Sequence, residues 1–468
     1  MKQSHLAKTL AILLALALCL SALAGCAAST TDTSASDTAS QTQESEDVSN
    51  PTVNETSTES TEPVTITLWI DNTTDAREAI YNQLIEQYEA ENPNINVELL
   101  GVSGDMTEKL DIALAAGSPP DCSTLVQGSV SSYVLNGELL SLDSYLADWD
   151  CYDQVLSSAW ETVESFNAID DQMYALPFAS NVWCLWVNTT MYEDADVALP
   201  TTWDNFFTAV EALYNADAGT YGIAIRGGSG GGTSLEYMMY SYSGLLNYFN
   251  EDGTCTINDP KNVEFVEKYL GLYDEYTAES DLNNGWSELA AAFQSGSAAT
   301  IMHNLGSANS HAEAFGNDYS LFEALPLPEC SEGYTVYPQM NVSGYCIYSA
   351  TEHPDETWDF ISWLSEAEQA SAVAQTYGIM PVNSVALQDD WVSDYPWFQM
   401  AATLMADSNT KYYDSPFTYP EYSSIMSTYV EPMIQECMAG EITAQELCDT
   451  WAGLMEQMKT EFDANFAN

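Results

Sequence analysis

Hydrophobic and polar residues begin to alternate at Val64, where the folded body of the chain is expected to start. Every second side chain from Val64 to Ile70 is aliphatic, which predicts a β-strand. Between Ile80 and Tyr88 apolar side chains recur at helical spacing, and Asn92-Pro93 ends the pattern. The next predicted elements are a strand at 95–100, a helix at 106–116 and a strand at 122–126. This strand–helix order predicts a parallel sheet with helices on both faces.

A second unit of the same kind is predicted from the apolar run 182–187, so the expected fold class is α/β. Further strands are predicted at 221–225, 298–302 and 344–349. Helices are predicted from Leu235, over 260–273, over 286–294 and from Pro354, and the pattern from about Trp397 onward is mostly helical.

The N-terminal residues 1–25 have the pattern of a secretory signal. Lys2 and Lys8 precede an apolar run, Leu10 to Leu23, that is too short to span a membrane. The run ends in Leu-Ala-Gly-Cys at Cys26, which resembles a bacterial lipobox. The resemblance implies cleavage before Cys26, a diacylglycerol on its thiol, and a protein anchored on the outer face of the cytoplasmic membrane. An ordinary secretory signal is the alternative.

Residues 26–63 are predicted to be a disordered tether. From Ala27 to Pro63 the chain contains mainly Ser, Thr, Asp and Glu, and it lacks aromatic residues, Leu, Ile and Met. Such a segment cannot bury enough apolar surface to offset the entropy lost on ordering. We expect it to hold the folded body near the membrane but away from its surface.

The charge of the chain excludes two classes of partner. Nine Lys and Arg stand against 70 Asp and Glu, for a formal net charge of −61. Nucleic acids and anionic lipid surfaces require basic patches that so few cations cannot supply. The eight cysteines beyond Cys26 lack metal-binding spacing, so neither a metal nor a cofactor is expected. Disulfides among them and buried free thiols both remain possible at this stage.

Several segments, in order, resemble family 1 of the extracellular solute-binding proteins of ATP-driven importers, which includes maltodextrin- and multiple-sugar-binding proteins. The matching segments are "ITLWIDNT", "KLDIALAAGSPPD", "YALPFASNVWCLWVNTTMY", "PTTWDNF", "FQSGSAATIMHNLGS" and "HPDETWDFISWLS" with "GIMPVN". The chain departs from the family pattern at Leu305-Gly306, where many members carry an aromatic residue, and at Val187-Asn188, which replaces Tyr-Asn.

The resemblance implies a two-lobe periplasmic-binding-protein-like fold of type II, with a ligand cleft between the lobes. The chain would cross between lobes near 179–182, 329–338 and 386–391. Lobe one would comprise 64–179 with 338–386, and lobe two 182–330 with 391–468. The implied function is capture of a sugar or oligosaccharide by lobe closure and its delivery to the permease subunits of an ABC transporter. We expect a monomer without enzymatic activity.

Six side chains are candidate ligand contacts, because sugars are held by flat aromatic rings and by planar amides or carboxylates. Trp69 and Asp71 end the first strand, where open α/β sheets place their sites. The others are Asn181 and Trp183 at the first crossing, Trp286, and Asn304. Each also fits a structural role, the tryptophans as core residues and the polar groups as caps or turn residues. For His303 a structural role is favoured, and for Arg226 neutralisation of nearby acids.

Two other functions are weighed against sugar binding. Gly227 to Gly231 matches the nucleophile pattern G-x-S-x-G, which would make Ser229 the nucleophile of a hydrolase. The strong negative charge would suit a receptor for a cationic solute such as a polyamine. The types of residue that line the cleft distinguish these functions. Amides with stacked tryptophan favour sugar, several facing carboxylates favour a cation, and a Ser–His hydrogen bond favours hydrolysis.

Overall fold

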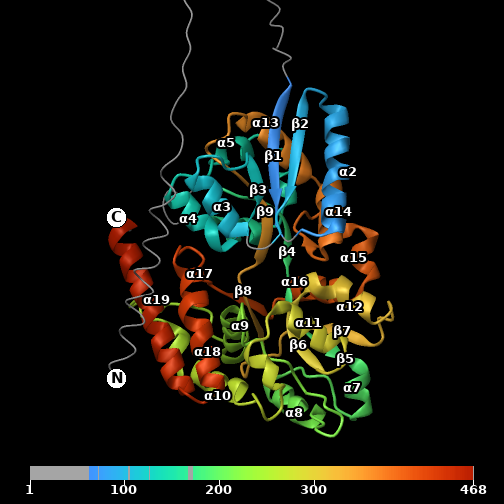
Figure 1. Ribbon diagram of the computed structural model, residues 1–468, viewed down its shortest axis with the longest axis vertical. Helices are drawn as coiled ribbons and strands as arrows, with labels where there is room; N and C mark the ends of the chain where they lie inside the picture. Colours follow the sequence, from blue (N-terminus) through green and yellow to red (C-terminus); the bar gives the residue numbers. More distant parts are fainter. Residues whose placement is uncertain (1–62, 72, 104–105, 126, 167–171, 467–468) are drawn as a thin grey trace, which may run out of the picture. The chain divides into compact units, whose positions relative to one another are not determined.

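The computed structural model describes residues 63–466, apart from 72, 104–105, 126 and 167–171. The predicted signal peptide, Cys26 and the tether up to residue 62 lie outside the described residues. Most of the elements discussed below are labelled in Figure 1.

Lobe one, as the structure has it, is built around a six-stranded sheet in the order β10-β4-β9-β3-β1-β2. β1 (Val64–Ile70) pairs in parallel with β2 (Ile95–Gly101) and with β3 (Cys122–Thr124), which confirms the predicted parallel unit. The other half of the sheet is antiparallel and comes from later segments: β4 (Leu176–Asn181), β9 (Asn341–Ile347) and β10 (Met380–Pro381).

The helices of lobe one follow the predicted apolar spacing. α2 (Asp75–Glu91) begins after Thr74, whose hydroxyl accepts a hydrogen bond from the backbone N–H of Arg77, and it buries one face against the sheet. α14 (Ala367–Tyr377) packs beside α2 and ends at Gly378, which adopts a left-handed φ of 71°. The remaining helices are α3 (Met106–Ala115), α4 (Val130–Leu135), α5 (Asp143–Leu146), α6 (Ser157–Glu164) and α13 (Pro354–Leu364).

Lobe two contains two smaller sheets. β5 (Trp183–Asn188) lies between β6 (Thr300–Asn304) and β7 (Phe322–Leu325), and both pairings are antiparallel. The expectation of a second unit like the first is therefore wrong for this sheet, because a short apolar run predicts a strand without fixing its partner or direction. The predicted strand at 221–225 forms only isolated parallel bridges, Tyr221 with Ala298 and Ala224 with Ile301. The second sheet pairs β8 (Thr335–Pro338) in parallel with β11 (Thr410–Tyr413).

Helices surround these sheets and account for most of lobe two. Those that precede β8 are α7 (Thr189–Asp194), α8 (Trp203–Leu213), α9 (Gly231–Ser243), α10 (Pro260–Leu270), α11 (Trp286–Gln294) and α12 (Ala308–Ala314). Those near the C-terminus are α15 (Asp390–Asp394), α16 (Pro396–Ala406), α17 (Tyr422–Ile425), α18 (Glu431–Met438) and α19 (Ala444–Phe466). The mostly helical character predicted beyond Trp397 is confirmed.

The chain crosses between the two lobes three times. The first crossing is Val182, between β4 and β5, and the second is Gln339–Met340, between β8 and β9 (Figure 1). β8 pairs with β11 in the second sheet of lobe two, so the second crossing follows Pro338. The third follows Asp389, whose carboxylate accepts a hydrogen bond from Ser371 of α14. Each lobe has its own apolar core, and Trp391, Met405 and Phe417 contact both cores.

The core of lobe two encloses the carboxyl group of Glu236. Glu236, on α9, is fully buried and accepts hydrogen bonds from the hydroxyl groups of Tyr248 (3.1 Å), Tyr413 (2.9 Å) and Tyr422 (3.0 Å). Burial raises the pKa of Glu236 from 4.5 to about 7, although the three tyrosine donors favour the charged form. The folded protein therefore holds a proton on Glu236 at pH values where the unfolded chain has released it.

We predict that Glu236 makes the free energy of unfolding depend on pH. Its stabilising contribution is complete below pH 4.5 and is lost as the pH rises through about 7. Glu236→Gln removes this titration. The difference in unfolding free energy between wild type and variant should therefore fall by about 2–3 kcal/mol across that interval. Urea unfolding at several pH values measures it, with the exposed Glu86→Gln as the matched control. Parallel pH profiles for wild type and Glu236→Gln would contradict the prediction.

Candidate functional site

A cavity of about 750 Å³, here called the cleft, is lined by side chains from both lobes and from the first crossing. Its volume is in the range of small-molecule binding sites. Lobe one contributes Asp71, Thr73, Thr74, Arg77, Ser103, Thr124, Leu125, Phe178, Ser343, Tyr377 and Ile379. Lobe two contributes Arg226, Trp286, Asn304 and Gly306, and Asn181 lies at the crossing.

The wall in lobe one is organised around the carboxyl end of β1. Asp71 follows this strand and is fixed to β3, because its backbone N–H donates to Thr124 Oγ1 (2.9 Å) and Thr124 Oγ1 donates to Asp71 Oδ1 (2.8 Å). The first turn of α2 carries Arg77, whose guanidinium carbon lies 3.8 Å from the ring centroid of Tyr377. The ring supports the guanidinium by a cation–π contact and limits its positions.

Two planar amides meet at the crossing. Asn181 ends β4, and its Oδ1 is buried without a hydrogen-bond partner among the described residues. Asn304 ends β6, and its Oδ1 accepts a hydrogen bond from the backbone N–H of Gly306 (3.0 Å). A Cβ added at Gly306 would approach both Asn304 Oδ1 and Asn181 Oδ1, so the small residue leaves space beside these amides. A buried acceptor without a partner is costly unless a ligand or water satisfies it.

The wall in lobe two is built on an aromatic stack. Trp286 begins α11, and its ring lies parallel to the imidazole of His303 on β6, with centroids 3.5 Å apart and planes 9° apart. Trp183 contacts the ring of Trp286 edge-on at 6.0 Å. Burial lowers the pKa of His303 well below its ordinary value, with smaller contributions from His311 and Arg226. His303 is therefore a neutral, flat support behind Trp286.

Arg226 lies beside this stack and is held by the glycine loop that follows it. Its guanidinium carbon is 5.5 Å from the ring centroid of Trp286, and its Nε donates to the backbone oxygen of Ser229 (2.6 Å). Gly230 has a φ of 80°, and a Cβ there would collide with the guanidinium of Arg226. The glycine-rich run Gly227–Gly231 matches the sequence pattern of a nucleophile turn, but in the structure it positions Arg226.

The structure brings four of the six candidate residues together at the cleft: Asp71, Asn181, Trp286 and Asn304. Trp183 is buried behind Trp286, and its Nε1 has no hydrogen-bond partner among the described residues. Trp69 is half-buried and packs against the core of lobe one, so it does not line the cleft. The alternation of β1 predicted that the side chain of Trp69 points away from Leu68 and Ile70, and helices were expected on both faces of the sheet. A packed Trp69 agrees with that expectation, and the candidate ligand role does not.

Sequence reasoning missed Arg77 and Tyr377, and it favoured charge neutralisation for Arg226. One signal could have identified both arginines. Arg77 and Arg226 are the only arginines in the whole chain, and guanidinium groups are rare enough here to mark a site. Tyr377 gave no comparable signal, because it lies at the end of a helix distant in sequence from α2.

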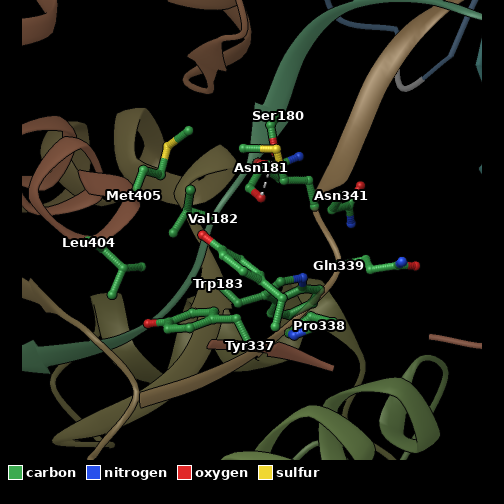
Figure 2. A pocket seen from close by; sticks show the side chains of 12 residues that line it. Ser180, Asn181, Val182, Trp183, Tyr337, Pro338, Gln339, Asn341, Leu404 and Met405 are labelled. Carbon is green, nitrogen blue, oxygen red and sulfur yellow. Dashed lines mark hydrogen bonds between the residues drawn. The ribbon is translucent and has the colours of Figure 1, made fainter. Parts of the chain in front are cut away.

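The first two crossings are packed against each other behind the cleft. A small crevice of about 20 Å³, enough for one water molecule, lies between Ser180–Trp183 and Tyr337–Asn341. Figure 2 shows the side chains that line it. Leu404 and Met405 of α16 close its far side. Asn181 lines both this crevice and the cleft, so the crossing lies between them.

The chemistry needed for the two alternative functions is not assembled at this site. In the described ranges, no hydrogen bond joins Ser229 to a histidine; His311 Nδ1 pairs with Gln294 (3.1 Å), and neither ring nitrogen of His303 has a partner. Asp71 is the one carboxylate among the residues that line the cleft.

Neither a metal site nor a membrane span is found within residues 63–466, excluding the gaps noted above. No group of three or more His, Cys, Asp or Glu side chains there could hold a metal ion. No helix in that part is long and apolar enough to cross a bilayer. The eight cysteines of that part of the chain could form disulfides or remain free thiols on the sequence alone. In the structure all eight are free, and they are buried or half-buried.

The chain is similar to known proteins in sequence and in fold. Residues 72–371 match the family model for bacterial extracellular solute-binding proteins. The maltotriose-binding protein of Pyrococcus abyssi is 24% identical over 321 residues, which cover 68% of this chain and 66% of that protein.

Two solved structures share the fold. The GacH receptor of Streptomyces glaucescens, determined unliganded and with acarbose, has a TM-score of 0.72 at 20% identity and covers 85% of this chain and 98% of its own. A solute-binding protein of Thermotoga lettingae with bound α-D-tagatose has a TM-score of 0.72 at 20% identity, covering 84% of this chain and 99% of its own. These similarities confirm the expected two-lobe α/β fold of the periplasmic binding proteins.

Proposed function

The chain belongs to the bacterial extracellular solute-binding protein family, and we propose that it captures a saccharide outside the cell for an ABC importer. The observation that carries this proposal is the combination of Trp286 with Asn181 and Asn304 in one cleft. A tryptophan face packs against the C–H face of a sugar ring, and amides exchange paired hydrogen bonds with its hydroxyl groups.

The rigid support of Trp286 favours this role. His303 and Trp183 hold the indole from two sides, so little side-chain entropy would be lost when a sugar ring stacks on it. The buried Oδ1 of Asn181 would gain a hydroxyl donor from a sugar. The relatives agree in ligand chemistry, since one is named for binding maltotriose and the solved structures hold acarbose and α-D-tagatose.

Neither alternative function gains support from the site. A polyamine receptor would need several carboxylates around its ligand, but the cleft residues include two arginines and one aspartate. Hydrolysis at Ser229 would need a base within hydrogen-bond reach, and the described residues hold no Ser229–histidine pair. We therefore propose that the protein binds and releases its solute chemically unaltered.

Closure of the lobes would report that the solute is bound. The proposed lobes are the parts of the chain built around the six-stranded sheet and around the two smaller sheets, with rotation absorbed at the crossings. A ligand shifts an open–closed equilibrium only by its differential contacts with the two states. A saccharide that touches Asp71 in lobe one and Trp286 in lobe two would make such contacts only when the lobes are closed. The closed monomer would then dock on the permease subunits in the membrane.

The proposal includes a lipid anchor at Cys26. The run Leu-Ala-Gly-Cys after an apolar segment supports cleavage before Cys26 and attachment of diacylglycerol to its thiol. The acidic segment 26–63 would then tether the body to the outer face of the cytoplasmic membrane.

We predict that Trp286→Ala weakens saccharide binding by about 1–3 kcal/mol, because the stacking area is lost. Trp286→Phe keeps a flat ring and should retain part of the affinity. The probe is the saccharide that most raises the melting temperature in a panel that includes maltotriose, and calorimetry measures its affinity. Trp69→Ala is the matched tryptophan control, expected to lower the melting temperature without changing affinity. Unchanged affinity in Trp286→Ala would contradict the stacking role.

We predict that the same saccharide reduces the radius of gyration of the soluble body in solution scattering. Closure brings residues of both lobes onto one ligand, and the solute should be recovered intact by mass spectrometry. Recovery of a hydrolysed product that disappears in Ser229→Ala would instead support the enzyme. An unchanged radius at saturating saccharide would contradict closure.

We predict that Cys26→Ala releases the protein from membranes into the soluble fraction, because the lipid is the proposed anchor. Fractionation in high salt followed by immunoblotting measures the distribution. Cys26→Ala that remains with the membrane under these conditions would show that another feature holds the protein there.

A further inference from the structure

A second cavity, here called the groove, lies on lobe one away from the cleft. Its volume is about 480 Å³, which is in the range of small-molecule sites. Its lining comes from the last turn of α2, from residues 144–151 and from α13 with the residues that follow it. Arg77 of the cleft is in the first turn of α2 and Tyr88 of the groove is in the last, roughly 16 Å apart along the helix axis. The two cavities share no lining residue.

The first part of the lining of the groove is aromatic. Five rings contribute to it, those of Tyr88, Tyr145, Trp149, Trp358 and Trp363. Tyr145 stacks on Trp358 with ring centroids 5.2 Å apart, and Trp149 contacts Trp358 edge-on at 6.1 Å. Tyr88 and Trp363 form a second pair at 5.3 Å. The rings therefore hold one another in position, and aromatic faces attract cations and cover apolar chains.

The second part of the lining is acidic, and it contains no lysine or arginine. The carboxylates are those of Asp148, Asp150, Asp359 and Glu366. Of the nine lysines and arginines in the chain, all but Lys2 and Lys8 lie within the part that the structure describes. None of these lines the groove, and none of the ion pairs found among the described residues includes one of its carboxylates. The groove therefore presents its acids to a ligand without cations of the chain beside them.

Neighbouring negative charges act on these acids without opposition. Burial and the charges of Asp355 and Glu356 raise the pKa of Asp359, and burial and the charge of Glu91 raise the pKa of Glu366. Neither shift is opposed by a positive charge or a hydrogen-bond donor among the described residues. The groove also lies at the C-terminal ends of α2 and α13, which have no basic residue in their last turns. Because a helix C-terminus carries partial negative charge, both ends favour a cation.

A hydroxyl group of the groove lacks a partner. Tyr88 is 3% exposed, and its hydroxyl oxygen is buried without a hydrogen-bond partner among the described residues. Burial raises the pKa of Tyr88, and the charge of Asp359 raises it further, so this carboxylate acts on the hydroxyl. Phe360 and Trp363 pack against the phenol ring at 5.0 and 5.3 Å and fix its position. A buried hydroxyl without a partner is costly, and a donor on a ligand would remove that cost.

We infer that the groove binds an organic amine with two or more ammonium groups on an apolar chain, such as a diamine or a polyamine. An ammonium group is attracted by the carboxylates and by the aromatic faces. Its N–H groups can donate to Asp359 and to the hydroxyl of Tyr88, which a quaternary ammonium ion cannot do. The methylene chain between two ammonium groups packs on the tryptophan rings. The groove thus has the lining for a cation that the cleft lacks, and the amine is not the solute proposed for transport.

The positions of the carboxylates favour more than one ammonium group. One acidic centre is Asp359, which acts on Tyr88. The other is formed by Glu366 and Asp150, because burial and then these two charges raise the pKa of the Cys151 thiol. A single metal ion is a poorer occupant, since no group of three or more side chains among the described residues could hold one. Aromatic rings also do not supply the oxygen ligands that a hard cation requires.

The experiment compares amines that differ only in charge or in N–H donors. The full chain is titrated by calorimetry with spermidine, putrescine, N-acetylputrescine, tetramethylammonium and 1,4-butanediol. N-acetylputrescine should bind about 10-fold less tightly than putrescine, because one ammonium group is lost, and the uncharged diol should not bind. Tetramethylammonium should bind less tightly than putrescine, because it has no donor for Tyr88. Saturating spermidine should leave the affinity for the best saccharide of the panel unchanged.

Variants assign the binding to the groove, because the net charge of the chain attracts any cation. Asp359→Asn keeps the size of the side chain and should weaken spermidine binding about 5-fold. Tyr88→Phe should weaken it about 10-fold without lowering the melting temperature of the free protein, since the unpartnered hydroxyl does not stabilise the fold. Asp217→Asn removes the same charge from an exposed position of lobe two outside the groove, and the affinity should not change.

Each other outcome overturns the inference in a recognisable way. Equal affinity of spermidine for wild type, Asp359→Asn and Asp217→Asn would show attraction by net charge only. Tetramethylammonium that binds as tightly as putrescine, with no effect of Tyr88→Phe, would show that N–H donation is wrong. A trilysine peptide that binds more tightly than every amine would make the occupant a basic protein segment. Failure of all saccharides to bind would refute the proposed function and leave this inference standing.

Discussion

The pairing of β4 with β9 is the constraint on which both lobes and the cleft depend. The two strands run antiparallel to a last pair at Asn181 and Asn341. The chain passes into lobe two directly after Asn181 and returns from it directly before Asn341. Gly344 allows this close pairing, because a Cβ there would collide with the carbonyl oxygen of Leu176. Two crossings therefore lie side by side, and any change of angle between the lobes must be absorbed there and at the third crossing, which follows Asp389. In such a change of angle Asn181 would stay fixed to lobe one, and Trp286 would move with lobe two.

The sequence predicted those parts of the molecule that local pattern determines. The parallel unit of β1, β2 and β3 follows from alternation and from helical spacing, and Asp71 was located because strand ends of such sheets carry sites. Trp69 shows the limit of this reasoning, since alternation gives the direction of a side chain but not what covers it. The antiparallel pairing of β5 and the parallel pairing of β8 with β11 depend on contacts between distant segments, which a single sequence does not encode in its periodicity. The saccharide function itself came from the family resemblance, and amino-acid type alone left each tryptophan open between core and ligand contact.

The net charge of this protein does not predict which charged residues line its cleft. A formal charge of −61 made a cationic solute worth considering, yet the lining of the cleft carries two arginines and one aspartate. Screening explains why the net charge of the chain does not determine the ligand. At physiological ionic strength the field of a surface charge decays over about 8 Å, whereas groups that line a cleft interact directly with the ligand. Composition therefore constrains solubility and excludes nucleic acid, but the position of the rarest charged residue is more informative about the site than the total.

Asp71 and Trp286 connect ligand binding to lobe closure in the proposed mechanism, because they line one cleft from different lobes. A ligand that touches both residues interacts more favourably with the closed form than with the open form. This difference is the quantity that shifts the equilibrium. The support of Trp286 by His303 serves the same step, since the ring is already in position and the free energy of binding can be used for closure.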